Sequence, residues 1–177
     1  SLPRAHLTLL VLGCVATAHH CPIRKAWSGQ QRDLAQQLTG TNVTKSNSNP
    51  YGSGNASFLA AGGEAGLIQL VDDFYNVMET LPEAATIREM HPDELTESRD
   101  KLSRFLSGWL NGPNIFRPKY GRISIPQAHS HLPIGKPEME AWLQCMEIAL
   151  SRQPYAENFK EYLLRQLRVP AERCRTR

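Results

Sequence analysis

The fold class that this sequence predicts is all-α. Across residues 64–169 the apolar side chains recur at spacings of three and four, which is the period of a helix with one buried face. No stretch alternates polar and apolar residues with the two-residue period of a strand over a useful length. The hydrophobic fraction of 41% suffices for a core in a chain of 177 residues. We therefore expect a domain of about five or six short helices, without an internal repeat.

The first strong helical pattern covers residues 64–81, "EAGLIQLVDDFYNVMETL". Pro82 follows it and can open a short helix over residues 82–90 at the first position, where the N–H group that proline lacks would have no partner in any case. The apolar residues of the long helix share one face, and they are Leu67, Leu70, Val71, Phe74, Val77 and Met78.

A further helix is predicted within residues 91–110. Asp93 or Thr96 could cap it, because short polar side chains accept hydrogen bonds from the free N–H groups at a helix start. The sequence "NGP" at residues 111–113 ends the pattern. The apolar side of this helix comprises Leu95, Leu102, Phe105, Leu106 and Trp109.

Residues 114–137 form an irregular segment that contains several prolines. Helical spacing resumes over residues 138–152, which carry Trp142, and again over residues 156–169. The chain therefore ends in two amphipathic helices after a long connection.

The N-terminal part has a different composition. The stretch before residue 57 is rich in Ser, Asn, Gly and Thr, so residues 1–56 are expected to be a poorly ordered extension or linker, and residues 57–177 the domain. The apolar run "LTLLVLGCVATA" has the length of a signal peptide, so export or lipid anchoring is one interpretation. The run is too short for stable membrane insertion. Because the first methionine is Met78, we expect the N-terminus to be a fragment, a processed product or mistranslated upstream sequence.

Charge and cysteine content narrow the function classes. The net charge is +3 and the basic residues are dispersed, so the sequence does not predict a nucleic-acid partner. The four cysteines show neither a CxxC pair nor a zinc spacing. This pattern suits a reducing compartment, and a cytoplasmic location is expected.

The stretch "AHSHLPIG", residues 128–135, places His129 and His131 two positions apart before the Trp142 helix. An imidazole is a good ligand for a transition metal. Either histidine could be such a ligand, the pair could form part of a zinc site, or both could be solvated loop residues. The spacing alone leaves these alternatives open.

Several motifs in one order carry a resemblance to a known family. They are "AAGGEAG", "LVDDFY", "LPEAATIREMHP", "KLSRFLSGWLNGP", "KYG", "HSHLPIG" and "EAWLQCM". Together they resemble the group II truncated haemoglobins over roughly residues 56–168. The resemblance implies a two-on-two helical sandwich around haem b, a cofactor whose iron binds oxygen and other diatomic ligands.

The resemblance also implies roles for individual residues. Counting back from Ile134 along the family motif makes His129, and not His131, the iron ligand, and the second ring nitrogen of His129 should donate to a backbone carbonyl. On the opposite face the family places Tyr75 and Trp142 as hydrogen-bond donors to the bound ligand.

His91 occupies a corner position from which it can donate to Tyr75 or to the ligand. Ser98 stands where many globins carry a distal histidine, which leaves the ligand route comparatively open. The apolar residues expected on or near the porphyrin are Phe74, Leu102, Phe105, Ile125, Leu132, Ile134 and Met146.

The sequence departs from the family pattern at the haem propionates. Pro126 and Ala128 stand where basic residues are common, and Phe116 replaces a frequent tyrosine. Nearby polar residues could substitute as propionate partners, namely Lys119, Tyr120, Arg117 and Arg122.

Reversible binding of oxygen is therefore the expected function, in a monomer or weak homodimer. The alternative is a haem-dependent redox enzyme, such as a nitric oxide dioxygenase or a peroxidase-like protein, which would rely on an external reductase.

Overall fold

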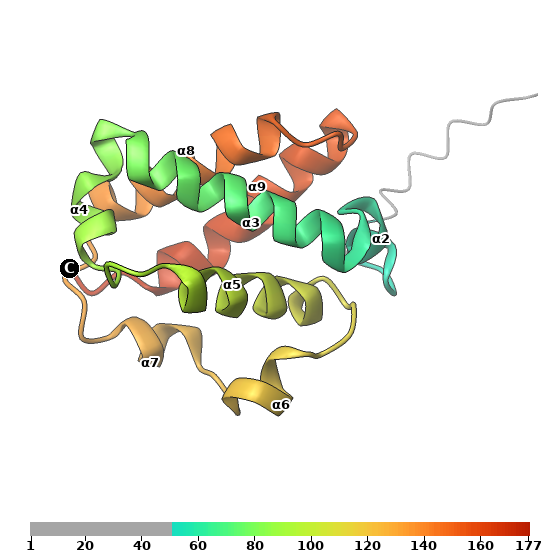
Figure 1. Ribbon diagram of the computed structural model, residues 1–177, viewed down its shortest axis with the longest axis horizontal. Helices are drawn as coiled ribbons and strands as arrows, with labels where there is room; N and C mark the ends of the chain where they lie inside the picture. Colours follow the sequence, from blue (N-terminus) through green and yellow to red (C-terminus); the bar gives the residue numbers. More distant parts are fainter. Residues whose placement is uncertain (1–50) are drawn as a thin grey trace, which may run out of the picture. The chain divides into compact units, whose positions relative to one another are not determined.

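The computed structural model describes residues 51–177, and this part of the chain is built from helices (Figure 1). No strand occurs within residues 51–177, so the all-α prediction is confirmed. The α-helices are α2 (Ala56–Ala60), α3 (Gly63–Thr80), α4 (Ala85–Glu89), α5 (Thr96–Trp109), α6 (Phe116–Tyr120), α7 (Ile125–His129), α8 (Lys136–Ser151) and α9 (Glu157–Arg173), and the 3-10 helix η1 (Pro82–Ala84) precedes α4.

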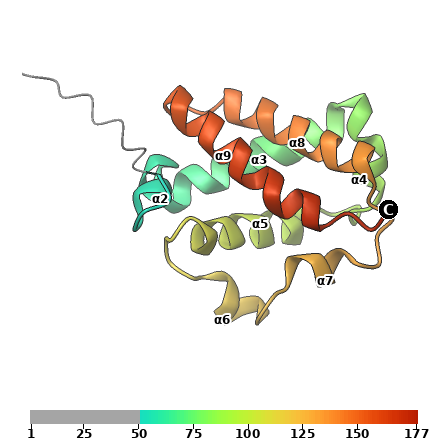
Figure 2. The ribbon, with the colours of Figure 1, turned by 180° about the vertical axis from the view of Figure 1, so that it is seen from behind.

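Four long helices form the frame of the domain. Helix α3 packs against both α5 and α8, and α8 packs against α9. In Figure 1, α3 and α5 lie in front of α8 and α9, and Figure 2 shows the second pair from its own side. The short helices α6 and α7 run along the outer edge below α5. The frame is therefore two pairs of helices, with the connection 114–135 closing one side.

The core lies where α3 meets α8 and α9. Phe74 and Phe159 are fully buried at its centre. All six residues of the apolar face predicted for α3 are also buried, because helical spacing places them on the side that contacts the other long helices. Burial of such side chains, about 1.5–3 kcal/mol each, drives the packing of the frame.

The turn between α2 and α3 depends on glycine. Gly62 and Gly63 have φ values of 75° and 67°, a backbone conformation that residues with a Cβ rarely adopt. At Gly66 a Cβ would lie 1.9 Å from the carbonyl oxygen of Ala61. The "AAGGEAG" motif is thus required by the close approach of α2 to the first turn of α3.

The start of α5 differs from the prediction. Helix α5 begins at Thr96 with Leu95 as its N-cap residue, and neither Asp93 nor Thr96 caps it. Instead, Glu94 Oε1 accepts hydrogen bonds from the Thr96 N–H and hydroxyl, at 3.1 and 2.6 Å. A carboxylate one residue before the cap position thus takes the place of the predicted cap.

The segment predicted as irregular contains two one-turn helices, α6 and α7, so residues 51–177 hold more helices than expected. Both are too short to show a helical period in sequence, and tertiary packing holds them. Helix α9 also continues past the predicted end at residue 169, through Pro170 to Arg173. Proline lacks an N–H donor, and near a helix end it removes a single backbone hydrogen bond.

The folded domain includes residues 51–56, which the composition of the sequence assigns to the N-terminal linker. Tyr51 packs on Phe159, with ring centroids 4.9 Å apart, and its hydroxyl donates to Asn158 Oδ1 at 3.1 Å. The apolar run interpreted as a signal peptide lies outside the described residues. Within residues 51–177, no helix is long and apolar enough to cross a membrane.

Candidate functional site

A cavity of about 550 Å³ opens between α5, the α6–α7 connection and the facing sides of α8 and α9. Its volume lies in the range of small-molecule and cofactor pockets, and most of its lining is apolar. The lining includes the following residues singled out from the sequence: Tyr75, His91, Ser98, Leu102, Phe105, Tyr120, Ile125, His129, Leu132, Ile134 and Trp142. Residues scattered over almost 70 positions of the chain thus meet at one cavity.

His129 closes the one-turn helix α7 and lines the cavity. Its Nδ1 lies 2.7 Å from the carbonyl oxygen of Ile125, one helical turn earlier. Because a carbonyl only accepts, Nδ1 carries the proton and donates, as expected from the sequence. The tautomer is therefore set, and Nε2 keeps the lone pair that a metal ligand needs.

The loop after His129 is held by residues near the end of the chain. The Thr176 hydroxyl donates to the Leu132 carbonyl at 2.7 Å and accepts from the Ile134 N–H at 3.1 Å, while the Thr176 N–H donates to the Ile134 carbonyl at 2.8 Å. Arg177 Nη2 donates to Glu138 Oε1 at 2.9 Å. We call Thr176 and Arg177 the C-terminal clamp, because they hold Leu132, Ile134 and Glu138, which lie between His129 and the first turn of α8.

Glu138 is the residue that joins this clamp to α8. Its Oε2 accepts the Gly135 N–H at 2.7 Å, and this hydrogen bond, followed by the Arg177 guanidinium, lowers the pKa of the Glu138 carboxyl. A charged carboxylate in the first turn of α8 also suits the positive end of the helix dipole. The turn that presents His129 therefore has a defined shape.

Tyr75 lies on α3, across the cavity from α7, with only 4% of its surface exposed. Burial raises the pKa of its phenol to about 12, against the smaller opposing effects of a hydrogen bond with Ser98 and of the Arg99 charge. The Arg99 guanidinium lies 5.4 Å from the ring centroid. Tyr75 is thus a neutral hydroxyl donor at any physiological pH.

His91 follows α4 at the corner before α5. Its Nδ1 lies 2.7 Å from the Ile87 carbonyl oxygen, and its ring meets the Tyr75 ring edge-on at 5.6 Å. Burial, the largest cause, lowers the pKa of His91 below its ordinary value of 6.5. The neutral imidazole again donates through Nδ1, which leaves Nε2 as an acceptor at the cavity.

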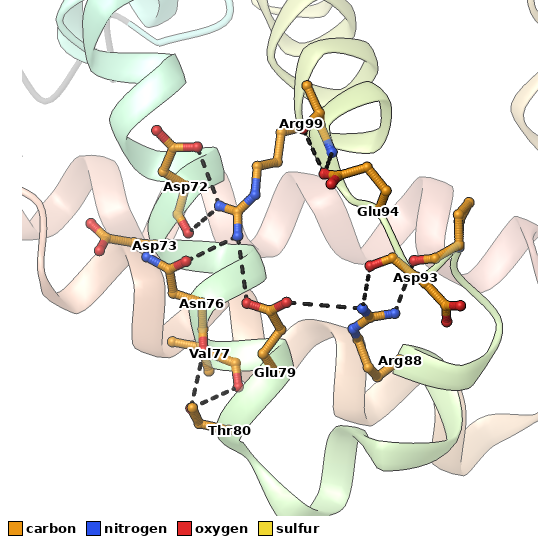
Figure 3. Close-up of polar contacts among 12 residues, drawn as sticks. Asp72, Asp73, Asn76, Val77, Glu79, Thr80, Arg88, Asp93, Glu94 and Arg99 are labelled. Carbon is orange, nitrogen blue, oxygen red and sulfur yellow. Dashed lines mark hydrogen bonds and ion pairs between the residues drawn. The ribbon is translucent and has the colours of Figure 1, made fainter.

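A charged network holds this corner from outside (Figure 3). Arg88 donates to the carbonyl oxygens of Pro92 and Asp93, each at 3.0 Å, and so fixes the turn after His91. Arg99 donates to the Asp72 carbonyl at 2.9 Å, and the two guanidinium groups approach the two oxygens of Glu79 at 3.9 and 3.7 Å. We call Arg88, Arg99, Asp72 and Glu79 the distal network.

Trp142 presents its ring to the cavity from α8 and packs on Phe74 with centroids 5.1 Å apart. Among residues 51–177 no acceptor is found for its indole N–H, while every fully buried side-chain polar atom there has a partner. The N–H group is therefore accessible and free to donate to an occupant of the cavity.

Four residues expected to contact the haem lie outside the lining, namely Phe74, Met146, Lys119 and Arg117. Phe74 and Met146 are fully buried in the core, behind the residues that face the cavity. Lys119 points to Asp100, whose carboxylate accepts from Lys119 Nζ at 2.9 Å and from the Tyr120 hydroxyl at 2.6 Å. Together with Arg104, these donors hold the pKa of Asp100 well below its ordinary value, the Tyr120 hydrogen bond being the largest cause.

Sequence reasoning missed a large share of the lining. The lining also contains Arg122, a predicted propionate partner, and Leu106, from the predicted apolar side of the 91–110 helix. The helical period of α9 could have indicated its inner face, but no local signal pointed to the other residues. The additional lining residues are Ile87, Met90, Lys101, Phe116, Ile123, Ala128, Glu138, Met139, Leu167, Pro170, Ala171 and Cys174.

The residues present fit a haem group. A largely apolar cavity is lined by an imidazole of set tautomer from α7 and by an indole from α8. The lining cations Lys101 and Arg122 could face the propionates. His131 is exposed and does not line the cavity, and within residues 51–177 no group of three or more His, Cys, Asp or Glu side chains could hold a non-haem metal.

Comparison with known proteins agrees with this geometry. Residues 56–173 match the family model of the bacterial-like globins. The chain is 32% identical over 117 residues to Group 2 truncated hemoglobin YjbI of Bacillus subtilis, an alignment that covers 66% of this chain and 86% of that protein.

Solved structures show the same architecture. The group II 2-on-2 hemoglobin of Agrobacterium tumefaciens superposes with a TM-score of 0.64 at 32% identity, covering 67% of this chain and 92% of that one. The truncated oxygen-avid haemoglobin of Bacillus subtilis gives 0.62 at 29% identity, covering 67% and 98%. This chain therefore belongs to the bacterial-like globin family, as a haem-binding truncated haemoglobin of group II with the two-on-two fold.

Proposed function

We propose that the protein binds oxygen reversibly at haem b, with His129 as the iron ligand. The observation that carries this proposal is the pair of opposed groups at one cavity: His129, with Nδ1 committed to the Ile125 carbonyl, and the donors Tyr75 and Trp142. Bound haem supplies an iron atom that coordinates a diatomic ligand. The name of the oxygen-avid relative from Bacillus subtilis supports the same ligand for this chain.

On the proximal side, the chain orients one imidazole. Because Nδ1 donates to the Ile125 carbonyl, Nε2 is the nitrogen available to coordinate iron, and the same hydrogen bond orients the ring. The turn from residue 130 to α8 is held by the C-terminal clamp, so the ring plane is restrained as well. We assign His129 as the sole protein ligand, with His131 outside the site.

On the distal side, the chain supplies neutral donors. The Tyr75 hydroxyl stays protonated because burial raises its pKa to about 12. The Trp142 indole can only donate. A diatomic ligand held by haem would carry partial negative charge, and a hydrogen bond from either residue to a charged acceptor would contribute about 1.5–3 kcal/mol. Two such donors slow the escape of oxygen far more than that of carbon monoxide.

Variants at the two histidines test the ligand assignment. The His129→Ala protein should lose stable haem, or hold it only when imidazole is added to fill the vacated position. His131→Ala is the matched control, two residues away, and should keep wild-type absorption spectra in the oxidised, reduced and carbon monoxide forms. If His131→Ala loses haem and His129→Ala keeps it, the assignment is wrong.

A further inference from the structure

A second concave surface lies on the outer side of α8 and α9. This basic groove, of about 780 Å³, is lined by Lys136, Met139, Glu140, Arg165, Arg168, Val169, Glu172, Arg173 and Arg175. Five of these side chains are cations and two are carboxylates. Arg168 pairs with Glu140 at 3.0 Å and Arg175 with Glu172 at 2.8 Å. The groove therefore has a strong excess of positive charge.

Three of the cations have no counter-ion. Lys136, Arg165 and Arg173 are exposed and make no ion pair within residues 51–177. By contrast, α3 carries Glu64, Asp72, Asp73 and Glu79 without a single lysine or arginine. The groove is thus a locally positive surface, and its unpaired cations can bind an acidic partner.

Val169 gives the groove an apolar centre. It is 51% exposed, one of the few large hydrophobic residues of α9 that face solvent, and arginines surround it. An apolar contact ringed by arginines is typical of protein interfaces, where arginine is enriched and bridges to partner carboxylates. A protein surface therefore suits the groove better than a small anion.

The groove backs directly onto the proposed haem cavity. Met139 lines both of them. On α9, Leu167, Pro170 and Ala171 face the cavity, and Arg168, Val169 and Glu172 face the groove. A partner seated in the groove would lie about one helix diameter, roughly 10–12 Å, from the haem.

We infer that the basic groove is the docking surface for an acidic electron-donor protein. This inference rests on the proposed function, because oxygen binding requires ferrous haem. One electron passes from the reduced donor to ferric iron; the donor is oxidised, the iron becomes ferrous, and no bond is made or broken. Charge complementarity steers the acidic donor to the face of α9 opposite the cavity.

The occupant is a protein rather than a membrane surface. The cations line the walls of a concave groove that also contains Glu140 and Glu172. Both carboxylates would oppose an anionic bilayer, whereas in a protein interface they remain paired with Arg168 and Arg175.

The test uses the full-length haem protein and a reduced, acidic plant-type [2Fe–2S] ferredoxin as the probe. Stopped-flow absorbance follows reduction of the ferric protein at several salt concentrations, and calorimetry measures binding of oxidised ferredoxin without any turnover. The variants are Arg165→Glu and Arg173→Glu. Arg152→Glu, at the far end of α8, is the control with the same change of net charge.

At low salt, Arg165→Glu and Arg173→Glu should each slow reduction by about tenfold and weaken ferredoxin binding in parallel. Arg152→Glu should change neither by more than about twofold, and added salt should remove the difference between variants. Dithionite, which needs no docking surface, should reduce all forms equally.

Equal losses in Arg152→Glu, or rates independent of salt, would overturn the docking proposal. Unchanged ferredoxin binding by the groove variants would also overturn it. In that case, binding of anionic phospholipid vesicles would identify a membrane as the occupant of the groove, and a dimer detected by sedimentation would identify a second globin copy. Failure of the oxygen proposal is seen separately, as a ferrous protein that forms no stable oxygen complex whichever donor reduced it.

Discussion

The two histidines of the cavity make the same local hydrogen bond, but different contacts hold the segments around them. His91 and His129 each place Nδ1 2.7 Å from a carbonyl oxygen four residues earlier. Beyond that bond, the corner at His91 is braced by the distal network of charged side chains, whereas the turn after His129 is held mainly by backbone and hydroxyl groups of the C-terminal clamp.

The difference separates two kinds of restraint. The distal network joins α3 to α4 and α5 through partly exposed ion pairs, which salt screens and which allow small movements. The clamp joins residues about 40 positions apart through two hydrogen bonds of the Thr176 hydroxyl, at 2.7 and 3.1 Å, and one ion pair, between Arg177 and Glu138 at 2.9 Å. The Glu138 side chain is only 10% exposed, so salt screens this pair less. A fixed proximal turn and an adjustable distal corner suit a site that holds a cofactor permanently and a ligand transiently.

The largest effect is expected from removing the distal donors. Tyr75→Phe and Trp142→Phe should each raise the oxygen dissociation rate by about tenfold or more, because a charge-assisted hydrogen bond is lost. Carbon monoxide, which gains far less negative charge, should respond much less. Stopped-flow ligand replacement measures both rates.

The double variant need not show the product of the single effects, because residues that act on one ligand are seldom additive. His131→Ala, outside the cavity, is the control and should leave both rates unchanged. Equal changes for oxygen and carbon monoxide would indicate altered access past Ser98 and Leu102, and the hydrogen-bond account would fail.

A smaller effect is expected from the clamp. Thr176→Val removes two hydrogen bonds to the turn after His129, each about 1 kcal/mol at most at an exposed position, and should speed haem loss several-fold. The iron–histidine vibration in the resonance Raman spectrum should also shift or broaden, because the imidazole is less restrained.

Thr80→Val is the matched control for the clamp. The Thr80 hydroxyl donates only to carbonyls of its own helix, Asn76 and Val77. It should change neither haem loss nor the vibration. A Thr176→Val protein with the wild-type vibration would show that the clamp does not position His129.

A still smaller effect is expected from removing one member of the distal network. Arg99→Met removes contacts with Asp72 at 3.2 Å and Glu79 at 3.7 Å, and should lower the free energy of unfolding by about 1 kcal/mol or less. Chemical denaturation with urea at low and at high salt measures the loss, which should shrink at about 1 M salt. A loss that is independent of salt would assign the effect to packing of Arg99 on Tyr75.

The smallest expected effect is on the pH dependence of the free energy of unfolding. Burial lowers the pKa of His91 below 6.5, so the unfolded chain binds more protons than the folded one in the window just below that value. The contribution of His91 to stability is complete above pH 6.5 and declines as the pH falls through this window. Urea unfolding between about pH 5 and 8 should show a smaller acid loss for His91→Phe than for wild type. An unchanged pH profile would show that His91 titrates alike in both states.

The helices of the frame could be predicted from the sequence to within a few residues. In α3 the predicted apolar face is the buried one, since the 3.6-residue period acts locally. Helices α6 and α7 could not be predicted, because a single turn has no period and forms only where its neighbours hold it.

The cavity residues that stand in family motifs could be predicted from the sequence. The cavity residues that come from distant segments could not. His129, Tyr75 and Trp142 stand in recognisable motifs and line the cavity. Phe74 and Tyr75 are adjacent on α3, yet one is in the core and the other faces the cavity. Which of two neighbouring apolar positions faces a cavity depends on the packing partner of the helix, and no residue pattern carries that information.

The sequence by itself determined the all-α class and the positions of the long helices, and its motifs predict His129 as the iron ligand. These follow from residue period and from motif order, both of which are local properties of the chain. Only the tertiary structure decided that α9 lines the cavity on one face and a basic groove on the other, and that Thr176 and Arg177 hold the turn after His129. Those contacts join segments about 40 residues apart, and they exist only once the long helices have packed.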